Sequence, residues 1–184
     1  MPASDEAVRR YRATLEMFRA RTAAGLVLVW DALESLDDEE QFLVGVAPVL
    51  TAASRATVST AAAFTFLALG ERPRAVIPSD VVINLDRRGP LLAAWHAFSE
   101  GRPYEEAVEV GRSRTQALAF DHVQSTSRRT GDVAAATTGR TVRWRRVPGS
   151  KACDWCRTVS GQLYRTAESA DFGHDRDDCV VVPA

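Results

Sequence analysis

The three cysteines of the chain and one of its histidines gather near the C-terminal end. Cys153 and Cys156 are separated by two residues, and His174 and Cys179 follow, which gives the spacing C-x2-C-x17-H-x4-C. Two cysteines at this spacing can reach one metal ion from a tight turn, and a later histidine and cysteine complete a tetrahedron of three thiolates and one imidazole. The spacing predicts a zinc site with these four ligands. Because four protein ligands leave no open position, we expect a structural zinc that adds binding free energy to a small module.

The residues around this cluster fit the prediction but leave alternatives open. Three thiolates and one neutral imidazole around zinc carry one net negative charge, and Lys151 and Arg157 lie beside them in the sequence. A carboxylate of Asp177 or Asp178 could replace one ligand. A thioredoxin-like redox pair also has the C-x2-C spacing, although it needs a βαβ unit that this segment does not offer. Buried cysteines without any metal are the third interpretation, since cysteine is among the most buried residue types.

Basic residues surround the first two cysteines and could bind an anion such as DNA. The segment 141–147, TVRWRRV, alternates in the manner of a strand, with Val142, Trp144 and, as a further candidate, Arg146 on one side. Arg143 and Arg145 would then share the other face, at a spacing that suits backbone phosphates. The whole candidate set for DNA or anion contact is Arg140, Arg143, Arg145, Arg146, Lys151 and Arg157. Alternatively, these arginines only keep an exposed strand soluble, and nearby acids such as Asp154, Asp171, Asp175, Asp177 and Asp178 would repel DNA.

The elements that position these residues are helices first and strands last. Apolar residues at helical spacing predict a long amphipathic helix over 5–36 and a second helix from Phe42 to about 69. The stripe of the first helix comprises Val8, Tyr11, Leu15, Phe18, Thr22, Leu26, Val29, Trp30 and Leu33. Pro48 lies deep in the second helix, so we expect either a kink there or a short turn before a restart. Residues 70–80 form a connector, and further helices are predicted at about 90–100 and 103–129.

The period of the sequence changes after Gly131. Segments 141–147, 162–166 and 179–183 are rich in Val, Tyr and Trp between turn residues, which predicts three short strands. The expected fold class is therefore α+β, with a mostly α-helical body of long amphipathic helices followed by a small C-terminal β module with a Cys3His zinc-type knuckle. We expect a helical domain at 1–131 and the β module at 132–184.

Composition excludes several classes of protein. The 184 residues are 46% hydrophobic and 26% charged, which is typical of a globular chain rather than a disordered one. No uncharged apolar run reaches the roughly 18 residues of a membrane span, so we expect a soluble protein without membrane contact. The N-terminal segment carries charge throughout and lacks the pattern of a secretion signal. The odd cysteine count favours a reducing compartment, and the net charge of −1 argues against a protein built mainly to neutralise phosphates.

Residues with catalytic potential are few. His96 and His122 lie on predicted helices without a nucleophile in a recognisable setting, and the chain has no G-x-S-x-G, H-E-x-x-H or phosphate-loop motif. The acids of the segment 35–40, SLDDEE, are typical of a helix start. We therefore expect no catalytic residues and no enzymatic activity.

Four stretches within the segment Gly101–Pro183 form a recognisable pattern, namely GRPYEEAVEVGRSRTQALAFDHVQ, VRWRRVPGSKACDWC, GQLYR and HDRDDCVVVP. With them the segment resembles the MuF-like minor capsid and head-morphogenesis proteins of tailed actinobacterial phages. In that family a long helix leads to an Arg-rich strand, a C-x2-C knuckle and a closing His-x-x-Cys-x-Cys segment before a proline. Here the first closing cysteine falls on Asp177, so that only Cys179 of the pair remains.

This resemblance implies a structural minor capsid protein that acts in head assembly, DNA packaging or DNA ejection. Its expected location is the virion, at the portal vertex or in the capsid interior, with the host cytoplasm as the site of assembly. The portal protein, other capsid proteins and the packaged DNA are the implied partners, and several copies are expected per virion. Some relatives carry a protease or toxin domain, for which we expect no room in this chain. A zinc-knuckle nucleic-acid-binding protein and a protein related to capsid maturation proteases are the alternatives.

Overall fold

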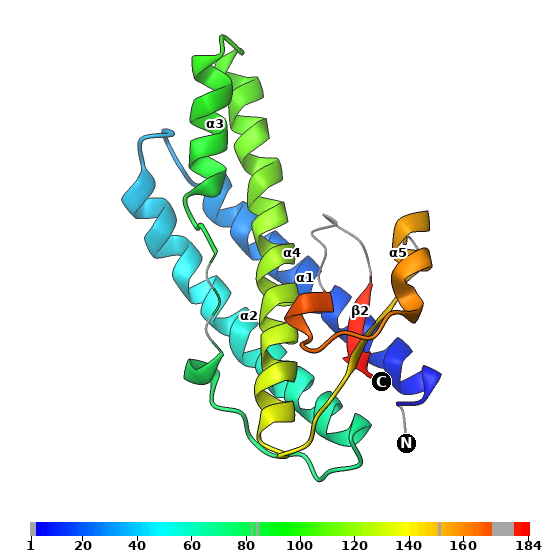
Figure 1. Cartoon of the computed structure of the whole chain (residues 1–184). Helices are drawn as coiled ribbons and strands as arrows, with labels where there is room; N and C mark the ends of the chain where they lie inside the picture. Colours follow the sequence, from blue (N-terminus) through cyan, green and yellow to red (C-terminus); the bar gives the residue numbers. More distant parts are fainter. Residues whose placement is uncertain (1–2, 82, 84, 151, 171–178) are drawn as a thin grey trace.

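A computed structural model of the chain describes residues 3–81, 83, 85–150, 152–170 and 179–184. Four long helices form the body, and a two-stranded sheet with one short helix lies against its lower right side (Figure 1). The elements are α1 (Asp5–Asp31), α2 (Glu39–Ala68), α3 (Gly89–Ser99), α4 (Tyr104–Ala136), β1 (Trp144–Val147), α5 (Asp154–Thr158) and β2 (Val180–Pro183). Three 3-10 turns are η1 (Pro78–Asp80), η2 (Val159–Gly161) and η3 (Glu168–Ala170). The predicted helical body with a small C-terminal sheet is confirmed.

Helix α1 begins at the predicted residue, Asp5, but ends earlier than predicted, at Asp31. The Ser4 side chain accepts the backbone N–H of Ala7 at 3.2 Å, which satisfies one of the unpaired donors of the first turn. The predicted end at Leu36 was wrong because the carboxylate of Asp38 accepts the backbone N–H groups of Glu34 and Ser35, at 3.1 and 2.9 Å. This acceptor stabilises the turn that separates α1 from α2.

Helix α2 is continuous through Pro48, so the alternative of a turn and restart was wrong. By length and mean hydropathy it could span a membrane, and one third of its most apolar window is buried in the molecule. Central helices of soluble proteins pass the same test. Since α2 packs on both α1 and α4, its apolar character agrees with the role of a core helix.

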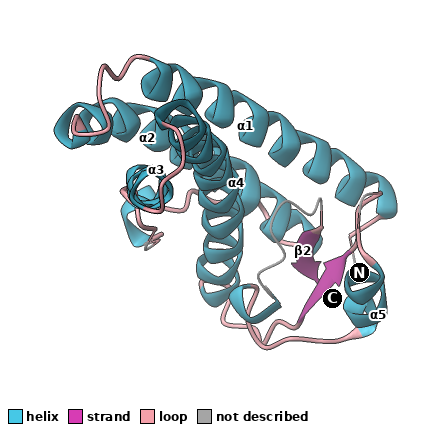
Figure 2. Ribbon diagram, turned by 90° about the horizontal axis from the view of Figure 1, so that it is seen from above, coloured by secondary structure: helices cyan, strands magenta, loops and turns pink. Residues whose placement is uncertain are grey.

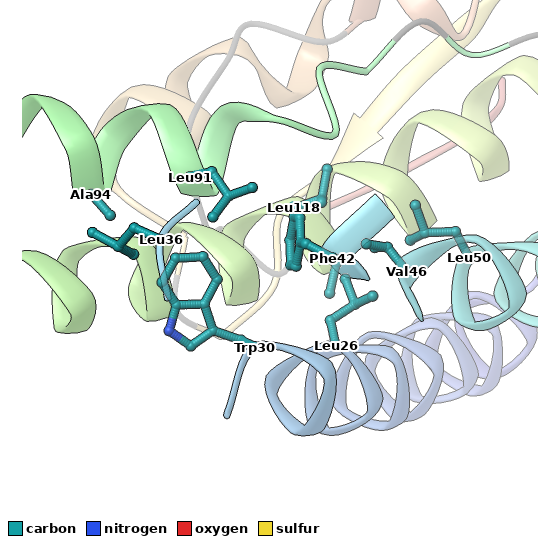
Figure 3. Packing of buried hydrophobic residues seen from close by; sticks show 10 residues of the cluster. Leu26, Trp30, Leu36, Phe42, Val46, Leu50, Leu91, Ala94 and Leu118 are labelled. Atoms are coloured by element: carbon teal, nitrogen blue, oxygen red, sulfur yellow. The ribbon is translucent and has the colours of Figure 1, made fainter. Parts of the chain in front are cut away.

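Glycines let the helices approach closely. A Cβ at Gly45 would lie 2.6 Å from Cγ1 of Val29, where α1 and α2 cross, and one at Gly111 of α4 would overlap the ring of Trp30. Trp30 also meets Phe42 edge to face, with ring centroids 5.7 Å apart. The side chains of this core cluster come from α1, α2, α3, α4 and the α1–α2 turn (Figure 3). They are Leu26, Trp30, Leu36, Phe42, Val46, Leu50, Leu91, Ala94, Leu118 and Ala119.

Helix α4 is longer than the predicted 103–129. It continues through Gly131, where the period of the sequence changes, to Ala136, and Gly131 lies against the indole of Trp144. A Cβ at Gly131 would lie 2.9 Å from Cη2 of Trp144. The helix therefore runs through the expected domain boundary at residue 131, and the division into two domains stays a prediction.

The sheet consists of β1 and β2 in antiparallel pairing, with Trp144 opposite Pro183 and Val147 opposite Val180. The first strand is shorter than the predicted 141–147, and the last matches the prediction of 179–183 closely. The strand predicted at 162–166 was wrong. Of this segment only Tyr164 pairs with Trp144, through backbone bonds of 2.8 and 3.0 Å, and its neighbours on either side are not in a strand.

The sheet packs onto the helical body instead of standing apart from it. Val180 and Val182 of β2 share a buried cluster with Tyr11 of α1, Ala61 of α2 and Val123 of α4. Ala3 packs against the same cluster, and both views place the two chain ends close together (Figures 1 and 2). The C-terminal strand is thus part of the main core.

Candidate functional site

The first two cysteines are placed by helix α5, which the sequence analysis did not predict. Cys153 is the residue before the helix, and its Sγ accepts the backbone N–H of Cys156 at 3.5 Å. Cys153 is exposed, whereas Cys156 is buried. The C-x2-C segment therefore forms one helical turn, with Cys153 as the cap and Cys156 inside the helix.

Cys179 reaches the same place from the other end of the module. It directly precedes β2 and packs with Cys156 and Ala152 in a small buried cluster. Two sulfurs that are far apart in the sequence are therefore neighbours in the fold. His174, Asp177 and Asp178 lie outside the described residues, so the fourth ligand and its possible replacement remain predictions.

The three cysteines are suitable donors for zinc, but the described residues do not form a complete zinc site. Within the described ranges, no three His, Cys, Asp or Glu side chains form a group that could hold a metal ion. Cys156 and Cys179 are both buried in one small cluster with Ala152, and Cys153 lies at the start of α5. Sulfur donors of this kind suit zinc. Zinc therefore stays a prediction.

Arg146 is the functional residue whose role the sequence analysis misjudged. We expected it among the DNA contacts, yet its side chain is only 1% exposed and points into the module. Its guanidinium donates to Sγ of Cys156 at 3.3 Å and to the backbone oxygen of Ala170 at 2.9 and 3.2 Å. It also lies over the ring of Trp155, 5.9 Å from the centroid. The burial of alternate residues along β1 explains the error, because Arg146 shares the inner side with Trp144.

The other basic candidates do not all face solvent as one patch, because Arg140 and Arg157 bond to other groups of the protein. Arg143 is exposed and Arg145 half-buried, on the side of β1 opposite Trp144, as the alternation predicted. Arg140 donates to the backbone oxygen of Leu69 at 2.9 Å and pairs with Glu71 at 3.2 Å. Arg157 donates to the backbone oxygen of Ala152 at 3.2 Å. Lys151 lies outside the described residues.

Polar side chains of the helices fix the cysteine module in place. Gln124 of α4 donates to the backbone oxygen of Cys179 at 3.2 Å, and the buried Arg19 of α1 donates to the side-chain oxygen of Gln124. Arg12 donates to the backbone oxygens of Val147 and Pro148, at 3.2 and 2.9 Å. The sequence analysis missed these residues. A signal for Arg19 was available, because it stands at helical spacing between Leu15 and Thr22 on the buried face of α1.

Asp132 anchors the turn η3 to the end of α4. Its two carboxylate oxygens accept the backbone N–H groups of Ala167 and Glu168, at 2.7 and 3.1 Å. Burial raises the pKa of this carboxyl group, against the opposing effect of the two N–H donors. The sequence contains no sign of this contact, because an aspartate near the end of a helix is ordinary and its partners lie 35 and 36 residues further on.

The two helix histidines have the structural or surface roles that we expected. His122 is buried on α4, with Nε2 3.0 Å from the backbone oxygen of Leu50 and 2.8 Å from Oγ of Ser54. An Nε2–H that donates to Leu50 cannot also take the proton of Ser54, so this pair links α2 to α4 and does not form a nucleophile and base. His96 is exposed and lies 3.4 Å from Glu100. The absence of enzymatic activity stays a prediction.

Comparison with known proteins places the chain among phage-encoded proteins. The family described as VG15 protein matches residues 2–184, nearly the whole chain. This chain belongs to the VG15 family. No curated protein and no solved structure matches it significantly.

Proposed function

We propose that this protein is a structural minor capsid protein that acts in head morphogenesis of a tailed phage. The observation that carries the proposal is the match to a phage protein family over residues 2–184. The helical body supports it, because α4 has 33 residues and spans about 50 Å at 1.5 Å per residue. A body of this length offers an extended surface for contacts inside a head, with the portal protein or other capsid proteins.

The distribution of charge suits a position between protein and DNA. Of the 24 acidic and 23 basic residues, eleven acidic and four basic ones lie in 31–40 and 86–112, which make up the α1–α2 turn, α3 and the first part of α4. The rest of the chain, with the sheet, carries a positive excess. In our proposal the exposed Arg143 and the half-buried Arg145 face packaged DNA, while the acidic end faces protein.

Zinc is part of the proposal as a structural ion. Cys153, Cys156 and Cys179 would hold it together with His174, or with Asp177 in place of one ligand. When bound, the ion would supply a cross-link between α5 and the start of β2. Arg146 would place its positive charge beside the sulfurs and so offset the excess negative charge of a zinc with three thiolates.

Particles of the phage that encodes this chain test the proposal. We expect the chain to copurify with DNA-filled heads in a small, fixed number of copies, and to be retained when soluble proteins are washed away. Deletion of its gene should yield heads that fail in assembly, packaging or ejection. A chain that is absent from purified heads, with normal heads formed in its absence, would contradict a virion role.

A nucleic-acid-binding protein outside the virion is the second candidate, favoured by the outward face of β1. A gel-shift titration with duplex DNA at several salt concentrations separates the two. Strong binding with a steep salt slope, lost in an Arg143→Ala and Arg145→Ala double variant, together with absence from heads, would favour this candidate. Weak binding by a chain present in heads would favour the capsid role.

A further inference from the structure

Four large apolar side chains are exposed on α3 and at the start of α4. The turn that joins these two helices lies at the top of the molecule (Figure 1). Leu92, Trp95 and Phe98 follow one another at three-residue steps along α3, and Tyr104 begins α4. Their exposed fractions are 56%, 39%, 42% and 43%. The ring centroids of Trp95 and Phe98 are 5.9 Å apart, and those of Phe98 and Tyr104 6.0 Å, so the three rings form one continuous row. We call these four residues the aromatic strip.

The strip is held rigidly although it faces outward. Trp95 donates its indole N–H to the backbone oxygen of Leu36 at 3.2 Å, which fixes the ring against the α1–α2 turn. The turn between α3 and α4 is short and contains Gly101 with φ of +89°, a conformation that favours glycine. Rings that are already ordered lose little conformational entropy on binding. Exposed tryptophan and tyrosine side chains of this kind are typical of binding hot spots.

The charges around the strip define its partner. Glu100, Glu105 and Glu106 lie at the α3–α4 turn and Glu109 one turn further along α4, against one exposed cation in the turn, Arg102. Further acids occupy the α1–α2 turn, to which Trp95 is hydrogen-bonded. The net negative charge of this rim makes phosphate, and with it nucleic acid and an anionic lipid surface, an unfavourable occupant. It complements lysine or arginine side chains around an apolar centre.

We propose that the aromatic strip is the docking surface for a protein partner whose contact face is apolar at its centre and rimmed by lysine or arginine. The proposal deepens the proposed capsid role, on which it rests, by assigning protein contact to this end of the molecule. The strip and the sheet lie at different ends of the body (Figure 1), so protein docking here leaves Arg143 and Arg145 accessible.

Site-specific photo-crosslinking within assembled particles tests the surface. The photoreactive phenylalanine analogue p-benzoylphenylalanine replaces Phe98 in one variant and Leu67 in a control, since Leu67 is 64% exposed on α2 and lies outside the strip. We expect position 98 to cross-link to one other virion protein, and position 67 to give no comparable product. Equal products from the two positions, or no product from position 98 in particles that contain the chain, would overturn the surface while the capsid role stands. Products that join only two copies of this chain would overturn the choice of partner.

The cross-linked protein, once purified, then serves as the probe for charge. A Leu92→Ser and Phe98→Ser double variant should bind it at least about tenfold more weakly, as expected for the loss of central apolar contacts. A Glu106→Gln and Glu109→Gln variant should bind more weakly at low salt and lose part of its salt dependence, whereas Glu16→Gln on α1 should bind like the parent chain. Binding that is insensitive to both double variants would overturn the proposal. Particles that lack the chain altogether would instead overturn the capsid role, and this surface with it.

Discussion

Gly111 is the residue on which the contact of α1 with α3 and α4 depends most directly. A methyl group there would overlap the ring of Trp30 and lie 3.0 Å from Cβ of Ala94, and both neighbours are buried in the core. We expect Gly111→Ala to destabilise the fold by about 1–3 kcal/mol, because the core has to shift. Urea unfolding followed by circular dichroism measures this. Gly161→Ala is the control, since no atom lies within 4 Å of that added group, and equal stabilities would show that the packing is looser than described.

His122 should make stability depend on pH near neutrality. Burial lowers its pKa below the ordinary value of 6.5, so the folded state keeps the imidazole neutral while the unfolded state takes up a proton. The stabilising contribution is complete above about pH 6.5 and is lost as the pH falls toward the lower pKa of the folded state. We expect His122→Gln, which can still donate to Leu50, to flatten the pH dependence of the free energy of unfolding.

His96→Gln provides the matched control for this measurement, because His96 is exposed on α3. Its profile should follow that of the parent chain between pH 5 and 8. If both variants kept the full pH dependence of the parent chain, groups other than His122 would have to cause it.

At the scale of elements, the guanidinium of Arg146 is one of the groups that hold the inner side of β1 to the module. Arg146→Met would keep much of the side-chain volume but remove both N–H donors to the Ala170 oxygen and the donor to Cys156. We expect a loss of about 1–3 kcal/mol, because a buried carbonyl oxygen is left without this partner. Arg145→Met, one residue away on the outer side, should change stability little.

Limited proteolysis provides the second readout for Arg146→Met, since local loss of structure should expose the C-terminal module first. Faster cleavage after residue 140 in Arg146→Met than in Arg145→Met would support the role of the guanidinium. Equal cleavage rates would contradict it.

The elements that the sequence predicted well are those with a repeating signal. The apolar stripe of α1 and the alternation of β1 report burial directly, since each side chain faces the core at the helical or strand period. Helix α5 has only five residues, too few for a period, and its start depends on the Cys153 sulfur as a cap. Arg19 escaped prediction because a buried arginine has no signature in composition, and its partner Gln124 is distant in the chain. The alternation did offer Arg146 as a candidate for the inner side, but its partner Ala170 could not be inferred.

The cysteine cluster was predictable only in part for the same reason. Spacing predicted that Cys153 and Cys156 share one turn, which the structure confirms. Cys179 shares a buried cluster with Cys156, while the convergence of all four predicted ligands on one ion stays a prediction. The contribution of Gln124 and Arg19 could not be inferred, because it depends on how α4 and α1 pack against the module.

For the molecule as a whole, metal content is the most informative measurement. We expect about one zinc per chain in protein purified under reducing conditions, and its loss in Cys153→Ser. This variant tests ligation without disturbing the core, because Cys153 is exposed while Cys156 is buried. Since β2 packs against α1, α2 and α4, removal of zinc by a chelator should also lower the melting temperature of the whole chain.

The control for metal content is Ser160→Ala, a substitution in η2 close to the knuckle that leaves all three sulfurs in place. It should retain the metal of the parent chain. A zinc ratio near zero in the parent chain, or full retention in Cys153→Ser, would show that the thiols stabilise the module without a metal ligated at Cys153.

The closeness of the two chain ends has a consequence for topology. With Ala3 packed against the cluster that contains Val180 and Val182, a short glycine linker could join the last residue to the first without crossing the core. New ends could then be opened in the extended connector between α2 and η1, where 72–75 are exposed. A circular permutant of this kind should fold to the same structure, since every core contact would be kept and only the order in which the chain visits its elements would change.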